Sequence, residues 1–457
     1  MRWRPRCASA HERAGPSTSA NRGARSAQGP SVSPPDPSRL SASEAVQRLA
    51  RRELSAVELV QACLARIAER DGEVRAFVHL AAAGALAQAR ALDAGPIRGP
   101  LHGLPLGVKD IFDTFDLPTE CGTPIYAGRQ PRADAAAVAL CRAAGAVVIG
   151  KTVTTELANM TAGPTRNPHH LGHTPGGSSS GSAAAVADCM VPLALGTQTA
   201  GSLIRPAACC GVVAVKPSFG RVPRAGVKSV AESLDTVGGF GRTVADVALL
   251  ASVLCGDPRI AALPAPDGVR IGFAPGPDWV QAETGVRAAW AHALRVFAPH
   301  GADAALPPDF ADVAQVQAAI QAVETAAAFA DERLRHAEQL SAPLRALLAH
   351  GAQIGVDAYR AHLARAARWR AEIDRLFDRF DVLLTPSAVD EAPEGLAHTG
   401  DPVFCRPWSL LGLPCVHLPF ARGESGLPVG LQLVGRHGAD DRLLAAAGWA
   451  MARLGDG

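Results

Sequence analysis

Two turns rich in glycine and serine, together with one lysine, are the parts of this sequence best suited to chemistry. The first turn, residues 175–182, reads PGGSSSGS, and the second, residues 196–206, reads GTQTAGSLIRP. A serine hydroxyl is a weak nucleophile until a base takes its proton. Lys109 could be that base if burial lowered the pKa of its amine. With backbone N–H groups in the turns to stabilise an oxyanion, these residues could cleave an amide.

Lysine is scarce in this chain, so each lysine can be considered separately. Only four of the 45 basic residues are lysine: Lys109, Lys151, Lys216 and Lys228. Arginine stays protonated at any working pH, whereas lysine can lose its proton. For Lys228 we expect a tolerated surface position. For Lys151 we expect a structural ion pair or cap with Glu156, and for Lys216 no chemistry.

Other interpretations of the two turns fit less well. A lone Gly/Ser-rich segment is most often a flexible loop. A phosphate-binding loop would end in Gly-Lys-Ser/Thr, and neither turn does. Residues 177–181 formally match the G-x-S-x-G pattern of a lipase-type elbow, but that elbow needs an apolar strand directly before it. The preceding residues, NPHHLGHTPG, are polar, so this interpretation is rejected.

Three histidines, His169, His170 and His173, precede the first turn and could be read as metal ligands. They lie in a loop rich in Pro and Gly without an acidic partner, so packing or solvation is the better interpretation. The ten cysteines include no C-x-x-C pair, and their spacing does not suggest a zinc site. We therefore expect neither a metal nor a cofactor.

These residues must be positioned by strands and helices. Short apolar runs predict buried strands, and capped periodic segments predict helices between them. The predicted strands lie at 104–112, 146–150, 191–197, 212–217, 270–275, 381–387, 415–420 and 429–435. The predicted helices run from the Ser55 cap to Gly72, over 134–144, over 182–188, from the Thr243 cap to Leu254, through most of 283–380, and over 440–454. This alternation predicts an α/β fold with helices on both faces of the sheet.

The composition of residues 1–38 differs from that of the rest of the chain. These residues are rich in Arg, Ser, Pro and Ala, which predicts a disordered N-terminal tail. They lack the apolar segment of a secretory signal, and an upstream start or an organelle transit peptide are the alternatives. No linker interrupts the remainder of the chain, so residues 39–457 are expected to form one domain.

The overall composition excludes several classes of protein. The formal net charge is only +2, which argues against a nucleic-acid-binding protein. The sequence contains no run of 18 uncharged apolar residues, so no membrane-spanning helix is predicted. The cysteines lie in apolar runs such as AACCGVVAV, which indicates a reducing compartment. We expect a cytoplasmic protein that acts on a small molecule and binds neither nucleic acid nor membrane; whether it forms a homodimer stays open.

Taken together, the motifs resemble those of the amidase signature hydrolases, over roughly residues 41–455. The shared motifs are GVKD (107–110), GKT-x-x-x-E (150–156), TRNP (165–168), PGGSSSGSAAAVA (175–187), GTQTAGSLIRPAACCGVVAVKPSFGRV (196–222) and GLP-x-G-x-Q (426–432). The spacing of 24 residues from Ser178 to Ser202, with GVKD before both, makes the pattern specific. The resemblance implies a single amidase-signature domain built on a mixed, twisted sheet.

The resemblance also implies a Ser–Ser–Lys triad. Ser202 matches the nucleophile and Lys109 the general base. Ser178 matches the serine that bridges them, and its peptide bond with the preceding residue is expected to be cis. Backbone N–H groups of the second turn match an oxyanion hole, and one further serine matches a residue that supports the lysine. The residues that match the oxyanion hole are Thr199, Ala200 and Gly201, and the serine that matches the supporting residue is Ser179.

Two positions in the second turn depart from the commonest pattern of that family. Ala200 stands where glycine is usual, but it keeps its N–H, so the oxyanion hole survives if its φ is negative. Gln198 stands where aspartate is usual, which removes a carboxylate that could have paired with Arg205. Arg205 then has another partner, or it is available to an acidic group of the substrate.

Three functions are consistent with these residues. The first is an amide hydrolase that cleaves a non-peptide C–N bond through an acyl-enzyme and releases ammonia or an amine. The second is an amidotransferase A-type subunit, which is a glutaminase that supplies ammonia to a tRNA-linked acid and needs a partner subunit. The third is a non-catalytic binding protein on the same fold, and retention of all three triad residues argues against it.

Overall fold

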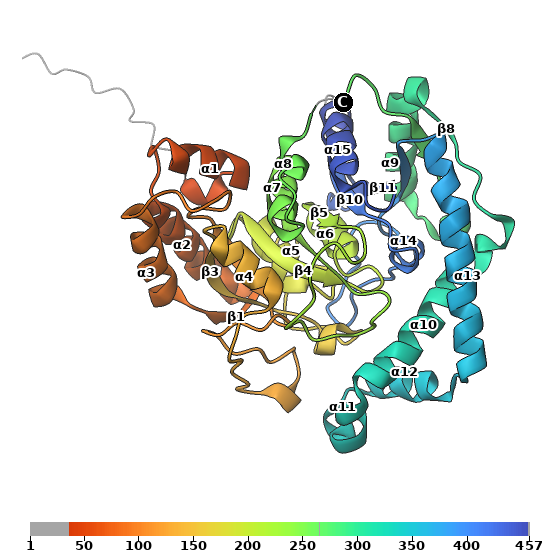
Figure 1. Cartoon of the computed structure of the whole chain (residues 1–457), viewed down its shortest axis with the longest axis horizontal. Coiled ribbons are helices and arrows are strands. Elements are labelled where there is room, and N and C mark those ends of the chain that lie inside the picture. Colours follow the sequence, from red (N-terminus) through yellow and green to blue (C-terminus); the bar gives the residue numbers. More distant parts are fainter. Residues whose placement is uncertain (1–35, 265, 456–457) are drawn as a thin grey trace, which may run out of the picture. The chain divides into compact units, whose positions relative to one another are not determined.

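The predicted strands join one mixed sheet (Figure 1). The computed structural model describes residues 36–264 and 266–455, and in these residues the sheet has 11 strands. They are β1 (Phe77–Leu80), β2 (Pro105–Lys109), β3 (Val147–Thr152), β4 (Leu193–Gln198), β5 (Val213–Lys216), β6 (Thr236–Gly241), β7 (Ile271–Phe273), β8 (Gly301–Asp303), β9 (Val382–Pro386), β10 (Cys415–Arg422) and β11 (Pro428–Gly435). The α/β class expected from the sequence is confirmed.

The order of the strands divides the sheet into two halves. Across the sheet the strands run β1-β3-β2-β4-β6-β5-β10-β11-β9-β7-β8. One half therefore comes from the chain up to β6, and the other half from β7 onward. The strands β3, β2 and β4 are parallel to one another. The carboxyl ends of β2 and β4 consequently meet at one edge, which brings Lys109 close to the second turn.

Fifteen α-helices accompany the sheet in the part of the chain that the structure describes. They are α1 (Ala42–Ala50), α2 (Ala56–Val74), α3 (Ala82–Asp93), α4 (Ala136–Ala143), α5 (Ser180–Ala187), α6 (Ile204–Cys210), α7 (Val244–Leu254), α8 (Arg259–Ala262), α9 (Thr284–Phe297), α10 (Val313–Ala328), α11 (Ala330–Arg335), α12 (Ala342–Gln353), α13 (Val356–Asp374), α14 (Arg406–Leu410) and α15 (Asp440–Leu454). None of these described helices is both long and apolar enough to cross a membrane.

Helices cover both faces of the sheet, as expected. Val213 and Val215 of β5 belong to one hydrophobic core, which contains α7, α9 and α15. Ala214, between them, belongs to the other core, which contains α5 and α6. Successive residues of a strand point to opposite faces, so this alternation separates two buried layers. Beyond the sheet, α11, α12 and α13 pack against α10, which also contacts α14 (Figure 1).

The sequence patterns do not indicate β1, β6 or β8. The omission of β6 has a clear reason, because this strand reads TVGGFG and glycine has a low strand propensity. A Cβ atom at Gly238 would lie 2.1 Å from the carbonyl oxygen of Val215, and one at Gly239 would lie 2.4 Å from Leu250. Glycine is therefore required by the close approach of neighbouring elements.

The helix that follows Ser55 ends later than expected. Its capping box is present: Ser55 Oγ accepts the N–H of Glu58 at 3.1 Å, and the N–H of Ser55 donates to the Glu58 carboxylate at 2.8 Å. Gly72, expected to end the helix, is an interior position where a Cβ atom would meet nothing within 4 Å. Glycine costs only about 1 kcal/mol there. The helix continues to buried Val74, and it stops there because the next residue, Arg75, has a left-handed φ of 56°.

The predicted tail, residues 1–38, lies outside the described residues except for its last three. These three residues begin the fold, because Pro37–Arg39 forms a short 3-10 helix in which Ser38 is buried. The Arg242 guanidinium donates to the backbone carbonyl of Ser38 at 3.3 Å and to that of Leu40. The described residues from 36 onward belong to one compact unit.

These contacts predict different effects for two truncations. Deleting residues 1–35 should leave the melting temperature nearly unchanged, because that segment has few apolar residues to pack. Deleting residues 1–40 removes buried Ser38 and Leu40 and leaves Arg242 without those two carbonyls, so the melting temperature should fall by about 2 °C or more. Thermal melts followed by circular dichroism measure both. Equal melting temperatures for the two variants would contradict a structural role for residues 36–40.

Candidate active site

Lys109 lies at the carboxyl end of β2, which pairs with the parallel strands β3 and β4 on its two sides. The residue is completely buried. Its Nζ donates a hydrogen bond to Ser178 Oγ at 2.7 Å and another to Thr197 Oγ1 at 3.0 Å. Both partners are neutral hydroxyl groups. No carboxylate of the described residues forms an ion pair with Lys109, so its immediate surroundings do little to stabilise a positive charge.

Burial lowers the pKa of Lys109 to about 7. The main cause is the loss of water around the ammonium group, and the charge of Asp235 opposes it only in part. An amine with such a pKa is substantially neutral at neutral pH. A general base works best when its pKa lies near the operating pH, so Lys109 has the electrostatic environment that the base requires.

The first turn brings Ser178 to Lys109. The peptide bond between Gly177 and Ser178 is cis, as the resemblance implies. Ser179, expected to support the lysine, contacts the backbone of Thr197 instead. Its Oγ donates to the Thr197 carbonyl and accepts the Thr197 N–H, each at 3.4 Å. The hydroxyl that does support Lys109 is that of Thr197, which Ser179 holds in place.

The central part of the second turn, residues 199–202, lies between β4 and α6 and is buried. Within residues 36–264 and 266–455, none of its four backbone N–H groups donates a hydrogen bond. Buried N–H groups are nearly always paired in folded proteins. Four unpaired donors in succession therefore mark a place where an acceptor from outside the chain can bind. Ala200 is not among the residues with positive φ, which meets the condition set for the oxyanion hole.

Ser202 lies at the end of this turn and is 8% exposed. The hydrogen bonds among the described residues link Lys109 to Ser178 but do not include the Ser202 hydroxyl. The structure thus brings together two of the three expected triad residues directly. Ser202 remains available to a substrate, and a bridging hydroxyl such as that of Ser178 is what would connect it to the amine.

Gln198 and Arg205 bind groups of the chain itself. The Oε1 atom of Gln198 accepts the N–H groups of Leu203 and Ile204 at 2.9 and 3.0 Å, so its amide oxygen caps the start of α6. The Arg205 guanidinium donates to the Gly177 carbonyl through Nε at 3.2 Å and through Nη2 at 2.7 Å.

Arg205 also donates through Nη1 to the carbonyl of Gly400 at 2.6 Å. Of the two alternatives left open by the sequence, the structure therefore provides other partners for Arg205. Its carbonyl partners connect the first turn to a segment from the last quarter of the chain.

Two polar residues of this region were not indicated by the sequence, Thr197 and Asp235. Thr197 has a recognisable signal, because it lies two residues after Leu195 and so shares its face of β4. Asp235 has no such signal. Its carboxylate accepts the hydroxyl of Thr199 at 2.6 Å and the N–H of Val230 at 2.7 Å, contacts that only the folded chain creates.

The expected pairing of Lys151 with Glu156 is wrong. Lys151 is completely buried and its Nζ lies 3.0 Å from the carboxylate of Asp110. Glu156 instead accepts the N–H of Ser341 at 2.9 Å, near the start of α12. Lys151 lies within β3, whereas Glu156 begins a short 3-10 helix (Glu156–Ala158), so their side chains reach different neighbours. The structural role expected of both residues is retained with these other partners.

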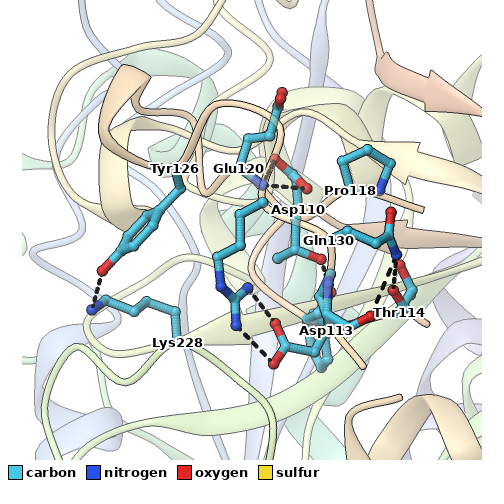
Figure 2. Close-up of polar contacts among 12 residues, drawn as sticks. Asp110, Asp113, Thr114, Pro118, Glu120, Tyr126, Gln130 and Lys228 are labelled. Atoms are coloured by element: carbon cyan, nitrogen blue, oxygen red, sulfur yellow. Dashed lines mark hydrogen bonds and ion pairs between the residues drawn. The ribbon is translucent and has the colours of Figure 1, made fainter. Parts of the chain in front are cut away.

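Lys228 is not the loosely tolerated surface residue that we expected. Its Nζ donates to Tyr126 Oη at 3.1 Å and to the Glu332 carboxylate, and it lies 5.1 Å from the centre of the Phe329 ring. Figure 2 shows Lys228 beside Tyr126, and Asp110 beside Glu120, whose N–H it accepts. Lys228 therefore joins the segment after β2 to α11.

The three histidines before the first turn contact backbone atoms. His169 Nε2 lies 2.9 Å from the carbonyl oxygen of Cys210, and His173 Nδ1 lies 2.7 Å from that of Ala392. The rings of His170 and His173 pack edge to face, with their centres 4.5 Å apart. These contacts agree with the loop-packing interpretation of the histidines.

A cavity of about 260 Å³ lies beside Thr197, one of the two partners of Lys109. Its charged lining is balanced, because Arg224 and Lys228 contribute positive charge and Glu232 and Asp235 negative charge. The lining therefore does not favour one sign of charge.

Comparison with known proteins identifies the family of the chain. A protein-family model described as amidase matches residues 58–444, which is well over half of the chain. The chain belongs to the amidase family. The A subunit of the glutamyl-tRNA(Gln) amidotransferase of Roseiflexus castenholzii is 37% identical to it, and the alignment covers 91% of this chain and 96% of the relative.

Solved structures show the same fold. A crystal structure of an amidase superposes with a TM-score of 0.82 at 32% identity, covering 91% of this chain and 100% of that one. A chain from the inhibitor-bound form of a vestigial complex, linked to the origins of an s-triazine catabolic enzyme, gives a TM-score of 0.85 at 28% identity, covering 90% and 98%. The family and these neighbours identify an amide-hydrolysing enzyme.

The surroundings of Lys109 predict the effect of Lys109→Arg. A guanidinium keeps the charge but does not accept a proton, so kcat/KM for amide hydrolysis should fall at least about a hundredfold. For the wild type, kcat/KM should decrease as the pH falls through about 7, because Lys109 then becomes protonated. A pH profile of kcat/KM measures this limb, and the variant should lose it.

Lys151→Arg is the matched control, because it makes the same change at a second buried lysine, whose ion pair with Asp110 requires only a positive charge. Circular dichroism verifies that both variants fold. Retention of more than about a tenth of the activity in Lys109→Arg would show that another group accepts the proton.

Proposed function

We propose that the chain hydrolyses a carboxylic amide through an acyl-enzyme on Ser202, with Ser178 and Lys109 completing the triad. The observation that carries this proposal is the pairing of a buried lysine, whose pKa is lowered to about 7, with Ser178. Close to this pair lies a turn whose four N–H groups find no acceptor among the described residues. A base and an oxyanion site are what a serine needs to attack an amide carbonyl.

In the first half of the reaction, the neutral amine of Lys109 takes the proton of the Ser178 hydroxyl, which takes that of Ser202. Ser202 Oγ forms a bond to the carbonyl carbon, and the carbonyl oxygen becomes an oxyanion that accepts the N–H groups of residues 199–202. When the C–N bond breaks, the proton returns through Ser178 to the leaving nitrogen. Ammonia or an amine departs, and the acyl group remains as an ester on Ser202.

In the second half, water replaces the leaving amine. Lys109 and Ser178 accept a proton from the water as its oxygen attacks the ester carbonyl. The bond to Ser202 Oγ then breaks, and the proton returns to Ser202. The products are the free acid and the regenerated serine, so the reaction requires no redox partner and every proton taken is given back.

Two kinds of amide are candidate substrates. The first is a small free amide, and the solved structure of an amidase at 32% identity supports it. The second is glutamine, as the ammonia donor of an amidotransferase. The curated relative at 37% identity is named as the A subunit of a glutamyl-tRNA(Gln) amidotransferase, and its alignment spans nearly both chains. This name favours the second candidate, which also requires partner subunits.

The nucleophile assignment predicts that Ser202→Ala folds normally and loses at least about a thousandfold in kcat. A fluorophosphonate should label the wild type at Ser202 and leave the variant unlabelled, as measured by mass spectrometry. Ser180→Ala is a suitable control, because Ser180 is a buried serine in the first turn whose hydroxyl bonds the carbonyl of Val153. Equal activity of Ser202→Ala and Ser180→Ala would refute the proposal.

The two candidate substrates are distinguished by ammonia release from the purified chain. A stand-alone amidase should release ammonia from members of a panel of small aliphatic and aromatic amides without any other protein. An amidotransferase subunit should act on glutamine, and this activity should rise when its partner subunits and the acylated tRNA are added. Hydrolysis of panel amides with no response to those additions would eliminate the second candidate.

A further inference from the structure

We propose that Gln317 and Ser409 are positioning residues that aim the N–H groups of Ala200 and Gly201 at the oxyanion. The inference rests on the proposed function, because it concerns the same turn. Neither residue lies in the shared motifs, and each reaches the turn from the second half of the chain, Gln317 from α10 and Ser409 from α14.

Two hydrogen bonds carry the proposal. Ser409 Oγ donates to the carbonyl oxygen of Ala200 at 2.6 Å, and Gln317 Nε2 donates to that of Thr199 at 3.3 Å. Both side chains are buried, with Ser409 at 1% and Gln317 at 0% exposed. The two carbonyls belong to successive peptide groups of the turn whose N–H groups have no acceptor in the described chain.

The planarity of the peptide bond transmits these contacts to the N–H groups. A carbonyl and the following N–H share one rigid plane and point in opposite directions. Fixing the Thr199 carbonyl therefore fixes the N–H of Ala200, and fixing the Ala200 carbonyl fixes the N–H of Gly201. Stabilisation of an oxyanion depends on donors that are already oriented before the charge develops.

Each of these side chains is itself oriented by another. Gln198 Nε2 donates to Ser409 Oγ at 3.0 Å, so the serine's own proton is directed to Ala200. Arg406 Nη1 donates to Gln317 Oε1 at 2.6 Å, which turns the amide nitrogen of Gln317 toward the turn. The directions of both hydrogen bonds are therefore determined by the network.

This arrangement gives Gln198 a purpose that an aspartate could not serve. An ionised carboxylate only accepts hydrogen bonds, whereas an amide both donates and accepts. With aspartate at position 198, the Ser409 hydroxyl would donate to the carboxylate, and the Ala200 carbonyl would lose its partner. An asparagine at position 409 could restore both contacts, because its amide group has two N–H donors. The longer asparagine also compensates for the shorter aspartate.

The primary test is Ser409→Ala, assayed on the amide that the wild type hydrolyses fastest. We expect kcat to fall by roughly tenfold to a hundredfold, somewhat less than the loss of an entire oxyanion donor, while KM stays within about twofold. Ser252→Ala is the matched control, because Ser252 is also a buried serine that donates to a backbone carbonyl, that of Leu249, at 2.7 Å. Thermal melts verify that the two variants are equally stable.

The second test changes the charge and the number of hydrogen-bond donors of two side chains instead of removing a side chain. Gln198→Asp should lower kcat by a similar factor, and adding Ser409→Asn to it should restore at least half of the lost activity on a logarithmic scale. A role in packing alone predicts no such rescue. If Ser409→Ala proves unstable, this pair of variants decides the question by itself.

The outcomes separate this proposal from the proposed function. If Ser202→Ala keeps wild-type activity, the proposed function fails. If Ser202→Ala is inactive while Ser409→Ala matches Ser252→Ala in kcat, only the positioning role is overturned. An increase in KM without a change in kcat, or no rescue of Gln198→Asp by Ser409→Asn, also overturns it.

Discussion

The active-site geometry depends on the burial of one lysine among neutral partners. Lys109 and Lys151 lie at the ends of neighbouring strands and are both fully buried, but their surroundings differ. Lys151 has the carboxylate of Asp110 at 3.0 Å, whereas the hydrogen bonds of Lys109 within the part of the chain that the structure describes go to two hydroxyl groups. Removing water without supplying an opposite charge favours the neutral amine.

The order of the strands explains how distant segments reach that amine. Strands β2 and β4 are parallel neighbours, so the residues at their carboxyl ends meet without any long loop. The segment between them provides the first turn, and α6 comes directly after the second. The other half of the sheet joins at β5 and β10. Its helices α10 and α14 bring Gln317 and Ser409 to the second turn, and Gly400, which lies in a loop, accepts a hydrogen bond from Arg205. The half of the chain that carries the motifs thus contains the groups to which we assign the chemistry. Side chains from the other half form hydrogen bonds with the backbone of the second turn.

Much of this could be predicted from the sequence, for identifiable reasons. The buried strands and the capped helices have local patterns, and the triad residues lie in motifs whose composition is unusual. The features that escaped prediction depend on contacts between distant positions. Gln198 finds Ser409 more than 200 residues later, and Lys151 turns to Asp110 rather than to the nearer Glu156. Strand β6 was missed because its glycines are required by neighbouring elements, which a pattern of residue propensities does not include.

The division of labour between the two halves has a consequence for a chain still being synthesised. A ribosome-bound polypeptide that has been made only as far as β8 already contains Lys109, Ser178 and Ser202. It lacks α10 and α14, and with them the side chains that hold the carbonyls of Thr199 and Ala200. Under the proposed function, the contacts that fix these two peptide planes form only when the last third of the chain has been synthesised.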